Sequence, residues 1–250
     1  MKNLPFFDAG CCIGDTMYSA GKNVQDLLQE MDRSGVERAL INHAAANSVP
    51  LLANQCISEM VAEAPDRLRG TWTFLTDQCP ELPPADQFFA EMKQKGIRAL
   101  NFFPEEHHYV ASPLSIGKIM GEAAERKIPI LLEAFSNNNW KGLYEFLEKF
   151  PRNTYIFRQK FGKWGCDRQI RPLLEHYENF YFGLSGYWVM EGIYDLAERY
   201  GAERILFASG YPDFNMGNQM LQLKHSKLSA EDIEKIAGKN LENLLEGAEL

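Results

Sequence analysis

The sequence predicts a single-domain (β/α)8 barrel, a TIM barrel of the α/β class, and three observations lead to that prediction. Eight short runs of β-forming residues alternate with eight segments of helical periodicity over residues 1–250. No linker, low-complexity tract or block of like charges interrupts the alternation. The 250 residues are 45% apolar, which is enough for one large buried core. Strands and helices that alternate in this way favour a closed parallel barrel.

The predicted strands share a richness in Ile, Leu, Phe, Tyr and Val. They are Pro5–Ala9, Arg38–Asn42, Leu68–Leu75, Ile97–Phe103, Ile128–Ala134, Thr154–Phe161, Phe180–Leu184 and Ile205–Ser209.

The predicted helices repeat apolar residues three and four positions apart, so each has one apolar face. They contain Val24–Met31, Ala53–Val61, Ala85–Met92, Ile116–Ala123, Leu143–Phe150, Ile170–Tyr177, Ile193–Tyr200 and Ile233–Leu244. Gly35, Gly96 and Gly201 follow such runs and suit helix C-termini, and Ser229 suits an N-cap.

An open, doubly wound sheet fits the sequence less well than a barrel. No GxGxxG turn follows the first predicted strand. The segment Gly14–Lys22 resembles a phosphate-binding P-loop only superficially, because six residues separate its glycines and Asn23 replaces the Ser or Thr.

The charge and the apolar pattern exclude two classes of partner. A net charge of −8 argues against binding to nucleic acid or to an acidic membrane surface, since both need clustered Lys and Arg. No apolar run approaches the roughly 18 to 20 residues of a membrane span, and the opening MKNLPFFDAG does not resemble a signal peptide. The odd number of cysteines, five, predicts reduced thiols. We therefore expect a cytoplasmic protein.

Seven segments, in this order and spacing, resemble the amidohydrolase superfamily, in the branch of aminocarboxymuconate semialdehyde decarboxylase. They span nearly the whole chain and are FFDAGCCIG (Phe6–Gly14), MDRSGVERAL (Met31–Leu40), APDRLRG (Ala64–Gly70), KGIRALNFFP (Lys95–Pro104), AAERKIPILLEA (Ala123–Ala134), AERILFASGYP (Ala202–Pro212) and IAGKNLENLL (Ile236–Leu245).

The resemblance implies a mononuclear metal site with histidines after strands one, five and six and an aspartate after strand eight. This sequence departs from that pattern, since the five positions fall on Gly10, Cys12, Glu133, Lys160 and Gly210. No HxH, HExxH or CxxC spacing occurs elsewhere. We therefore predict no metal and no other cofactor. A non-standard site that uses Cys12 and Glu133 stays open.

Glu133 and Lys160 are the predicted catalytic pair. The resemblance places the ends of strands five and six together, so a carboxylate and an ammonium there would neutralise each other where relatives hold a cation. Strand alternation puts Arg158 on the same face as Lys160, where it is expected to pair with Asp8. A slip in register that brings Arg158 or Gln159 to the histidine position is the alternative.

Other candidate residues follow the strands toward the same end. Cys12 is a candidate nucleophile, although buried cysteines are more often small apolar residues. His107 follows strand four on a loop and is a candidate binding residue, with a solvated loop as the alternative. Side chains expected to line a pocket for a small molecule, such as a carboxylate, are Asp8, Trp72, Asn101, Arg158 and Tyr211.

Two classes of function remain open on the sequence. One is a metal-independent small-molecule hydrolase or lyase that works through Glu133 and Lys160. The other is a catalytically inactive relative that serves as a ligand-binding or partner subunit. Relatives often form dimers, so a homodimer is also an open alternative.

Overall fold

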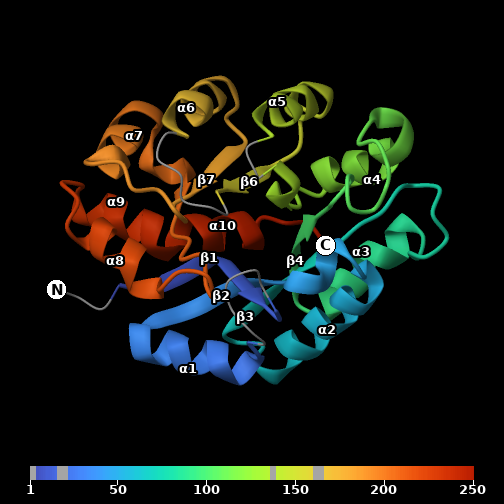
Figure 1. The fold of residues 1–250 in the computed structure, drawn as a ribbon, viewed down its shortest axis with the longest axis horizontal. Helices are drawn as coiled ribbons and strands as arrows, with labels where there is room; N and C mark the ends of the chain where they lie inside the picture. The colour runs from blue at the N-terminus through green and yellow to red at the C-terminus, as the bar shows by residue number, and fades with distance from the viewer. Residues whose placement is uncertain (1–3, 16–21, 136–138, 160–165) are drawn as a thin grey trace.

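The protein folds into a ring of parallel strands surrounded by helices (Figure 1). The computed structural model describes residues 4–15, 22–135, 139–159 and 166–250. The strands follow one another in chain order from β1 to β8. The Ala9 amide of β1 donates to the carbonyl oxygen of Phe207, directly after β8, at 2.9 Å. The two edges of the sheet therefore meet, and the predicted (β/α)8 barrel is confirmed.

The strands lie where the sequence predicts them, with ends that differ by a few residues. They are β1 Phe6–Ile13, β2 Val36–His43, β3 Leu68–Thr73, β4 Ile97–Asn101, β5 Ile130–Leu131, β6 Tyr155–Arg158, β7 Phe180–Gly183 and β8 Ile205–Leu206.

The helices and helical turns of the described residues cover the outside of the ring and one of its ends. The helices are α1 Val24–Ser34, α2 Pro50–Glu63, α3 Ala85–Gln94, α4 Pro113–Glu125, α5 Trp140–Lys149, α6 Asp167–His176, α7 Gly192–Tyr200, α8 Met216–Lys224, α9 Ala230–Glu234 and α10 Asn240–Glu246. The short turns are η1 Ala44–Asn47, η2 Glu133–Phe135, η3 Ala202–Arg204 and η4 Lys235–Lys239.

The C-terminal region differs from the sequence prediction in two ways. Helix α8 was not predicted, although Met216, Met220 and Leu223 repeat at helical spacing and are buried. The single helix expected after Ser229 is divided into α9, the π-helical turn η4 and α10. At η4 a Cβ on Gly238 would lie 2.2 Å from the Pro5 carbonyl oxygen, so this glycine allows the close approach of β1.

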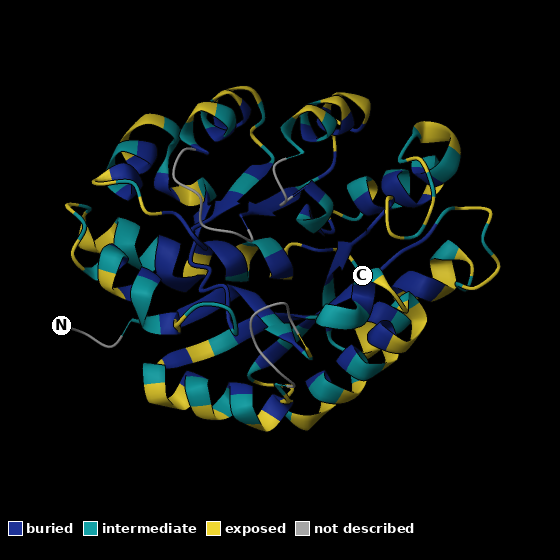
Figure 2. Cartoon of the chain, viewed as in Figure 1, coloured by how far each residue is buried: buried dark blue, intermediate teal, exposed yellow. Residues whose placement is uncertain are grey.

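Two apolar cores divide the interior, and both faces of the strands are buried (Figure 2). The larger core lies between the strands and the surrounding helices. The smaller one fills the inside of the ring and includes Leu241 and Leu245 of α10, which closes one end. Parallel strands covered on both faces have near-continuous apolar sequences, and this is the pattern from which the strands were predicted.

Several local predictions can be checked in the described part of the chain. Gly35 ends α1 in the left-handed region, at φ 78°, and the Ser229 hydroxyl accepts from the Asp232 amide at 3.1 Å. The five cysteines are not joined to one another by disulfide bonds. No helix among the described residues has the length and apolar composition that crossing a membrane requires.

Candidate active site

A layer of polar side chains lies inside the ring at the carboxyl ends of five neighbouring strands. Asn42 belongs to β2, Thr73 to β3, Asn101 to β4 and Arg158 to β6, and Glu133 follows β5. Four of the five are buried, and the Glu133 side chain is 9% exposed. We call these five residues the polar layer. Strand carboxyl ends are where barrel enzymes carry their chemistry.

Strand alternation explains why these side chains share one compartment. On each strand the residue two positions earlier faces the inside of the ring. Four of these earlier residues belong to the inner apolar core, and they are Leu40, Ala99, Leu131 and Ile156. The fifth, Thr71, pairs in register with Ala99.

An ion pair between Glu133 and Arg158 lies at the centre of the polar layer. The Arg158 Nη2 donates to Glu133 Oε1, and the Asn42 Nδ2 donates to Glu133 Oε2 at 2.7 Å. The Arg158 Nη1 donates to the Gly10 carbonyl oxygen at 3.3 Å. Burial opposes the charged form of Arg158, but the attraction of Glu133 outweighs it and the pKa of the guanidinium is raised. The Arg158 guanidinium therefore stays charged inside the barrel.

Small residues make room for the Arg158 side chain. A Cβ on Gly183 of β7 would lie 3.2 Å from the Arg158 Cβ, which is tight contact. A Cβ on Gly10 would lie 3.1 Å from the Ala208 Cβ, and it is this glycine whose carbonyl accepts from Arg158. Gly183 thus lets the backbone of β7 approach the Arg158 Cβ closely, and Gly10 lets the backbone of β1 approach the chain after β8.

Several buried polar atoms of the layer have unused hydrogen-bonding capacity. The Thr73 Oγ1 donates to the Asn101 Oδ1 at 2.5 Å, but the Asn101 Nδ2 has no partner among the described residues. The same holds for the Asn42 Oδ1 and the Arg158 Nε. A buried polar group without a partner is costly, so these atoms are where a bound water or ligand would gain most. Two of the three atoms are donors and one is an acceptor.

The predicted Asp8–Arg158 pair is wrong. The Asp8 Oδ1 accepts from the amides of Gly10 at 2.8 Å and Ser209 at 2.9 Å, and Arg158 pairs with Glu133 instead. A register shift between Asp8 and Cys11 interrupts β1, and Phe7 and Ala9 are the residues that enter the inner core. Burial raises the pKa of the Asp8 carboxyl, and hydrogen bonds from Ser209 and Gly10 oppose that rise. Asp8 thus holds backbone together between β1 and the chain after β8.

Trp72 and Tyr211, predicted to line the pocket, lie on the helix side of the strands. The Trp72 Nε1 donates to the Asn54 carbonyl oxygen of α2 at 2.9 Å, and its ring lies 5.3 Å from that of Phe88 in α3. Tyr211 belongs to the outer core, where burial, with a smaller contribution from the Asp26 carboxylate, raises its pKa to about 12. Both predictions failed because position at a strand end does not by itself tell which face a side chain takes.

Of the remaining predicted residues, the structure describes Cys12 and His107 but not Lys160. Cys12 is half-buried at the end of β1, and its thiol lies 3.9 Å from the Ile13 carbonyl oxygen. The His107 Nε2 lies 3.1 Å from the Ala46 carbonyl oxygen, so this ring contacts η1. Lys160 lies outside the described residues, and the Glu133–Lys160 pair stays a prediction. Asn42 and Thr73 are the members of the layer that the sequence reasoning missed, although both lie in the carboxyl-terminal part of predicted strands, which was a usable signal.

The described residues do not supply a donor set for a divalent metal ion. Among them no three His, Cys, Asp or Glu side chains come together as a metal site would require. Of the five positions that were predicted to match metal ligands, Gly10 and Gly210 carry no side chain. Both carboxylate oxygens of Glu133 accept hydrogen bonds, one of them from a guanidinium. The positive charge beside the Glu133 carboxylate is therefore the Arg158 guanidinium.

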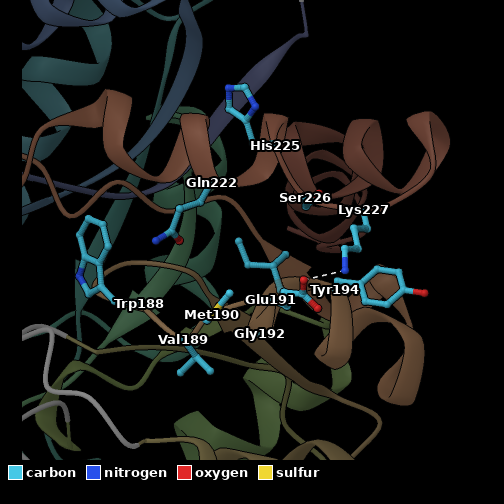
Figure 3. A pocket seen from close by; sticks show the side chains of 11 residues that line it. Trp188, Val189, Met190, Glu191, Gly192, Tyr194, Gln222, His225, Ser226 and Lys227 are labelled. Atoms are coloured by element: carbon cyan, nitrogen blue, oxygen red, sulfur yellow. Dashed lines mark ion pairs between the residues drawn. The ribbon is translucent and has the colours of Figure 1, made fainter.

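A pocket of about 330 Å³ lies apart from the polar layer, between the segment that leads into α7 and the end of α8 (Figure 3). Trp188 and Met190 line it and are largely exposed. Glu191 pairs with Lys227 at 2.6 Å and has a left-handed backbone at φ 56°. The ion pair is more than half exposed, and exposed pairs contribute little to stability.

A closed parallel barrel with buried charged groups at its strand carboxyl ends is the arrangement in which TIM-barrel enzymes hold their active sites. The sequence matches the amidohydrolase family over residues 13–246. This chain therefore belongs to the amidohydrolase family, as the seven segments predict. A comparison with curated protein sequences finds no match.

Three solved structures illustrate the likeness in fold. A 2,6-dihydroxybenzoate decarboxylase in complex with 2,6-dihydroxybenzoate has a TM-score of 0.75 at 16% identity, covering 98% of this chain and 99% of that one. A dihydroxybenzoic acid decarboxylase from Polaromonas sp. JS666, with bound manganese and the inhibitor 2-nitroresorcinol, has a TM-score of 0.74 at 18% identity, covering 97% of each chain. The 4-oxalomesaconate hydratase from Rhodopseudomonas palustris has a TM-score of 0.69 at 16% identity, covering 97% and 96%.

Proposed function

We propose that this protein is a lyase or hydrolase for a small carboxylic acid, of the aromatic acid class, and that it works without a divalent metal. The observation that carries the proposal is the Glu133–Arg158 ion pair, buried among polar groups where the family's metal would be expected. Family membership and the two decarboxylases of similar fold support the substrate class.

The polar layer offers the groups that such chemistry needs. The unpartnered Asn101 Nδ2 and Arg158 Nε are donors suited to a carboxylate or carbonyl oxygen of the substrate. Glu133 is the carboxylate of the layer and would relay a proton from water to the substrate carbon. In a decarboxylation the bond from that carbon to the carboxylate breaks, and the carbon dioxide takes up the remaining hydroxide as bicarbonate. In a hydration the hydroxide adds to the neighbouring carbon. Lys160 and Cys12 remain proposed contributors from the ends of the neighbouring strands.

Metal independence has its own direct test. Protein purified without chelator is analysed for transition metals, and we expect far less than one equivalent per chain. About one equivalent of manganese or zinc that persists through dialysis would overturn the metal-free part of the proposal.

The substrate class is tested by a thermal-shift screen of small aromatic carboxylates, followed by an assay for release of carbon dioxide or loss of the substrate's absorbance. Arg158→Lys should abolish both ligand stabilisation and turnover, because an ammonium cannot reach Glu133 and the Gly10 carbonyl oxygen and also offer a donor to the substrate where the Arg158 Nε lies. Arg199→Lys, at an exposed position on α7, is the matched control and should change neither. Lys160→Met tests the predicted working lysine in the same assays.

A catalytically inactive, ligand-binding relative is the second candidate. It is favoured by the engagement of both Glu133 oxygens by protein donors, which is also what a purely structural pair would show. Ligand-dependent stabilisation without turnover of any stabilising compound would select this candidate over the enzyme.

A further inference from the structure

Two histidines, one at the end of β2 and one on the segment after β4, contact the helical turn η1, which follows β2. The His43 Nδ1 accepts from the Ala45 amide at 3.1 Å and caps the turn. The His107 Nε2, on the segment after β4, lies 3.1 Å from the Ala46 carbonyl oxygen. One ring therefore accepts from the turn, and the other donates to it.

The turn η1 is connected directly to the polar layer. It begins two residues after Asn42, whose amide donates to Glu133. Ala46 also packs with Ala53 and Phe103 in a small apolar cluster of its own. The His107 hydrogen bond and this cluster join the segments that leave β2 and β4 at the mouth of the barrel.

The contact of His43 requires a neutral ring, because its Nδ1 accepts, and the buried Nδ1 of His107 favours a neutral ring. A carbonyl oxygen only accepts, so the His107 Nε2 carries the proton and its Nδ1, which is buried and has no partner among the described residues, carries none. Protonation would place a buried N–H at that nitrogen without an acceptor. Protonation of His43 would turn its Nδ1 from an acceptor into a donor that faces the Ala45 N–H.

The surroundings of both rings disfavour the charged form. Burial lowers the pKa of His43, and no ionisable group among the described residues offsets it. Burial also lowers the pKa of His107. The hydrogen bond to the Ala46 carbonyl and the charge of Glu106 raise it by less, and His108 lowers it further. The remaining neighbours are the backbone of Gly14, which faces the His43 ring from β1, and the Phe103 ring, 5.9 Å from that of His107.

We propose that His43 and His107 are positioning residues that clamp η1 against the polar layer, and that protonation loosens the turn because the Ala45 amide loses its acceptor on His43 and His107 gains a buried N–H without an acceptor. Mildly acidic solution would then loosen the turn and, with it, the hold of Asn42 on Glu133. The consequence for ligand binding rests on the proposed function, but the release of η1 does not.

Hydrogen exchange of the ligand-free protein tests the release. Protection factors of the amides of Ala45 to Val49, corrected for the intrinsic rate, are compared at about pH 7.5 and about pH 5, on either side of the ordinary histidine pKa of about 6.5. We expect a fall on the order of fivefold or more at the lower pH, which is the size of a lost cap. Protection that does not change with pH would overturn the proposal.

Substitutions that keep the contacts but cannot titrate provide the second arm. Asn at 43 can accept from the Ala45 amide, and Gln at 107 can donate to the Ala46 carbonyl oxygen. We expect His43→Asn combined with His107→Gln to remove the dependence on pH, and His108→Asn, at an exposed position of left-handed φ 57°, to retain it. A double variant that keeps the wild-type fall in protection would refute the clamp.

A measurement on the wild type covers the case in which the double variant does not fold. The ring nitrogens of His43 and His107 are titrated by NMR together with the Ala45 and Ala46 amides. The clamp predicts that the ring and amide signals change at the same pH. Amide changes that occur without titration of either ring would exclude it.

If the clamp controls the proposed site, ligand stabilisation should weaken over the same range of pH in the wild type and stay constant in the double variant. Loss of the exchange effect would count against the clamp. An intact exchange effect with no ligand at any pH would count against the proposed function alone.

Discussion

The inside of the barrel contains two layers that are built on opposite principles. The lower layer is apolar and is closed below by α10. The polar layer above it has an ion pair and three buried polar atoms without partners among the described residues. The lower layer consists of Phe7, Ala9, Leu40, Ala99, Leu131, Ile156, Leu206 and Ala208, with Leu241 and Leu245.

The difference between the layers separates stability from function. Each large apolar side chain of the lower layer contributes about 1.5 to 3 kcal/mol by leaving water. A buried ion pair contributes little net stability, and each unpartnered polar atom costs about 1 to 3 kcal/mol. An arrangement that lowers stability is kept where it serves binding or catalysis, so the polar layer is the part of the interior that selection for function explains.

Removing one partner of the ion pair should give the largest effect. Glu133→Ala leaves Arg158 charged and buried without its carboxylate, and we expect a loss of about 3 to 5 kcal/mol in the free energy of unfolding. Urea denaturation of the variant and the wild type at neutral pH measures it.

The matched control replaces the ion pair of the polar layer with apolar side chains like those of the lower layer. Glu133→Leu combined with Arg158→Met removes both charges, and this double variant should be more stable than Glu133→Ala by several kcal/mol while binding no ligand. Equal stability of the double variant and Glu133→Ala would mean that the pair's geometry, rather than an unpaired charge, sets the cost.

A truncation in the lower layer should be costly for stability alone. Leu131→Ala opens a cavity below the polar layer, and we expect a loss of about 2 to 4 kcal/mol. The dissociation constant of any compound found in the thermal-shift screen should stay within about twofold at a temperature where the variant is folded. A large loss of affinity would show that the two layers are not separable.

The fold could be predicted almost completely from the sequence, because both faces of its strands are apolar and its helices are amphipathic. The period of the pattern identifies an element even when its ends are uncertain. Helix α8 was missed because only Met216, Met220 and Leu223 mark it, and the turn η4 was missed because it depends on the contact of Gly238 with β1, far away in the sequence.

The site could be predicted only in part, because its geometry depends on which face each strand residue takes. Glu133, Arg158 and Asn101 lie inside the barrel, but Arg158 pairs with Glu133 and not, as the alternation predicted, with Asp8. The alternation failed at β1, where a bulge moves Asp8 out of step, and Trp72 was chosen by its type rather than by its face. The sequence gives no signal for a bulge of this kind, since it arises from the pairing of β1 with β2.

Asp8 is a buried carboxylate outside the polar layer, and it can be compared with Glu133 inside it. Its pKa is raised by burial, so ionisation of Asp8 costs folding free energy above that pKa and costs nothing below the ordinary carboxyl value. Asp8→Asn keeps an oxygen for the Gly10 and Ser209 amides. We expect the variant to be more stable than the wild type by roughly 1 kcal/mol at pH about 8, the scale of one buried hydrogen-bonding group.

The pH dependence of that gain is the test. The gain should shrink as the pH falls toward about 4, because the wild-type carboxyl becomes protonated and the two proteins then differ little. Chemical denaturation at several pH values measures it. A gain that grows in acid would have the wrong sign and would mean that the pKa of Asp8 is lowered in the folded protein.

Thr71 marks the boundary between the two layers and should give the smallest effect. Its hydroxyl is buried and has no partner among the described residues, and its strand neighbour is Ala99 of the lower layer. Thr71→Val removes the hydroxyl at nearly constant volume, so we expect unchanged ligand binding and a gain in stability of up to about 1 kcal/mol. Chemical denaturation measures the difference. A loss of stability instead would mean that a buried water bonds the hydroxyl, and the polar layer would then extend one residue deeper into β3 than the protein's own hydrogen bonds reach.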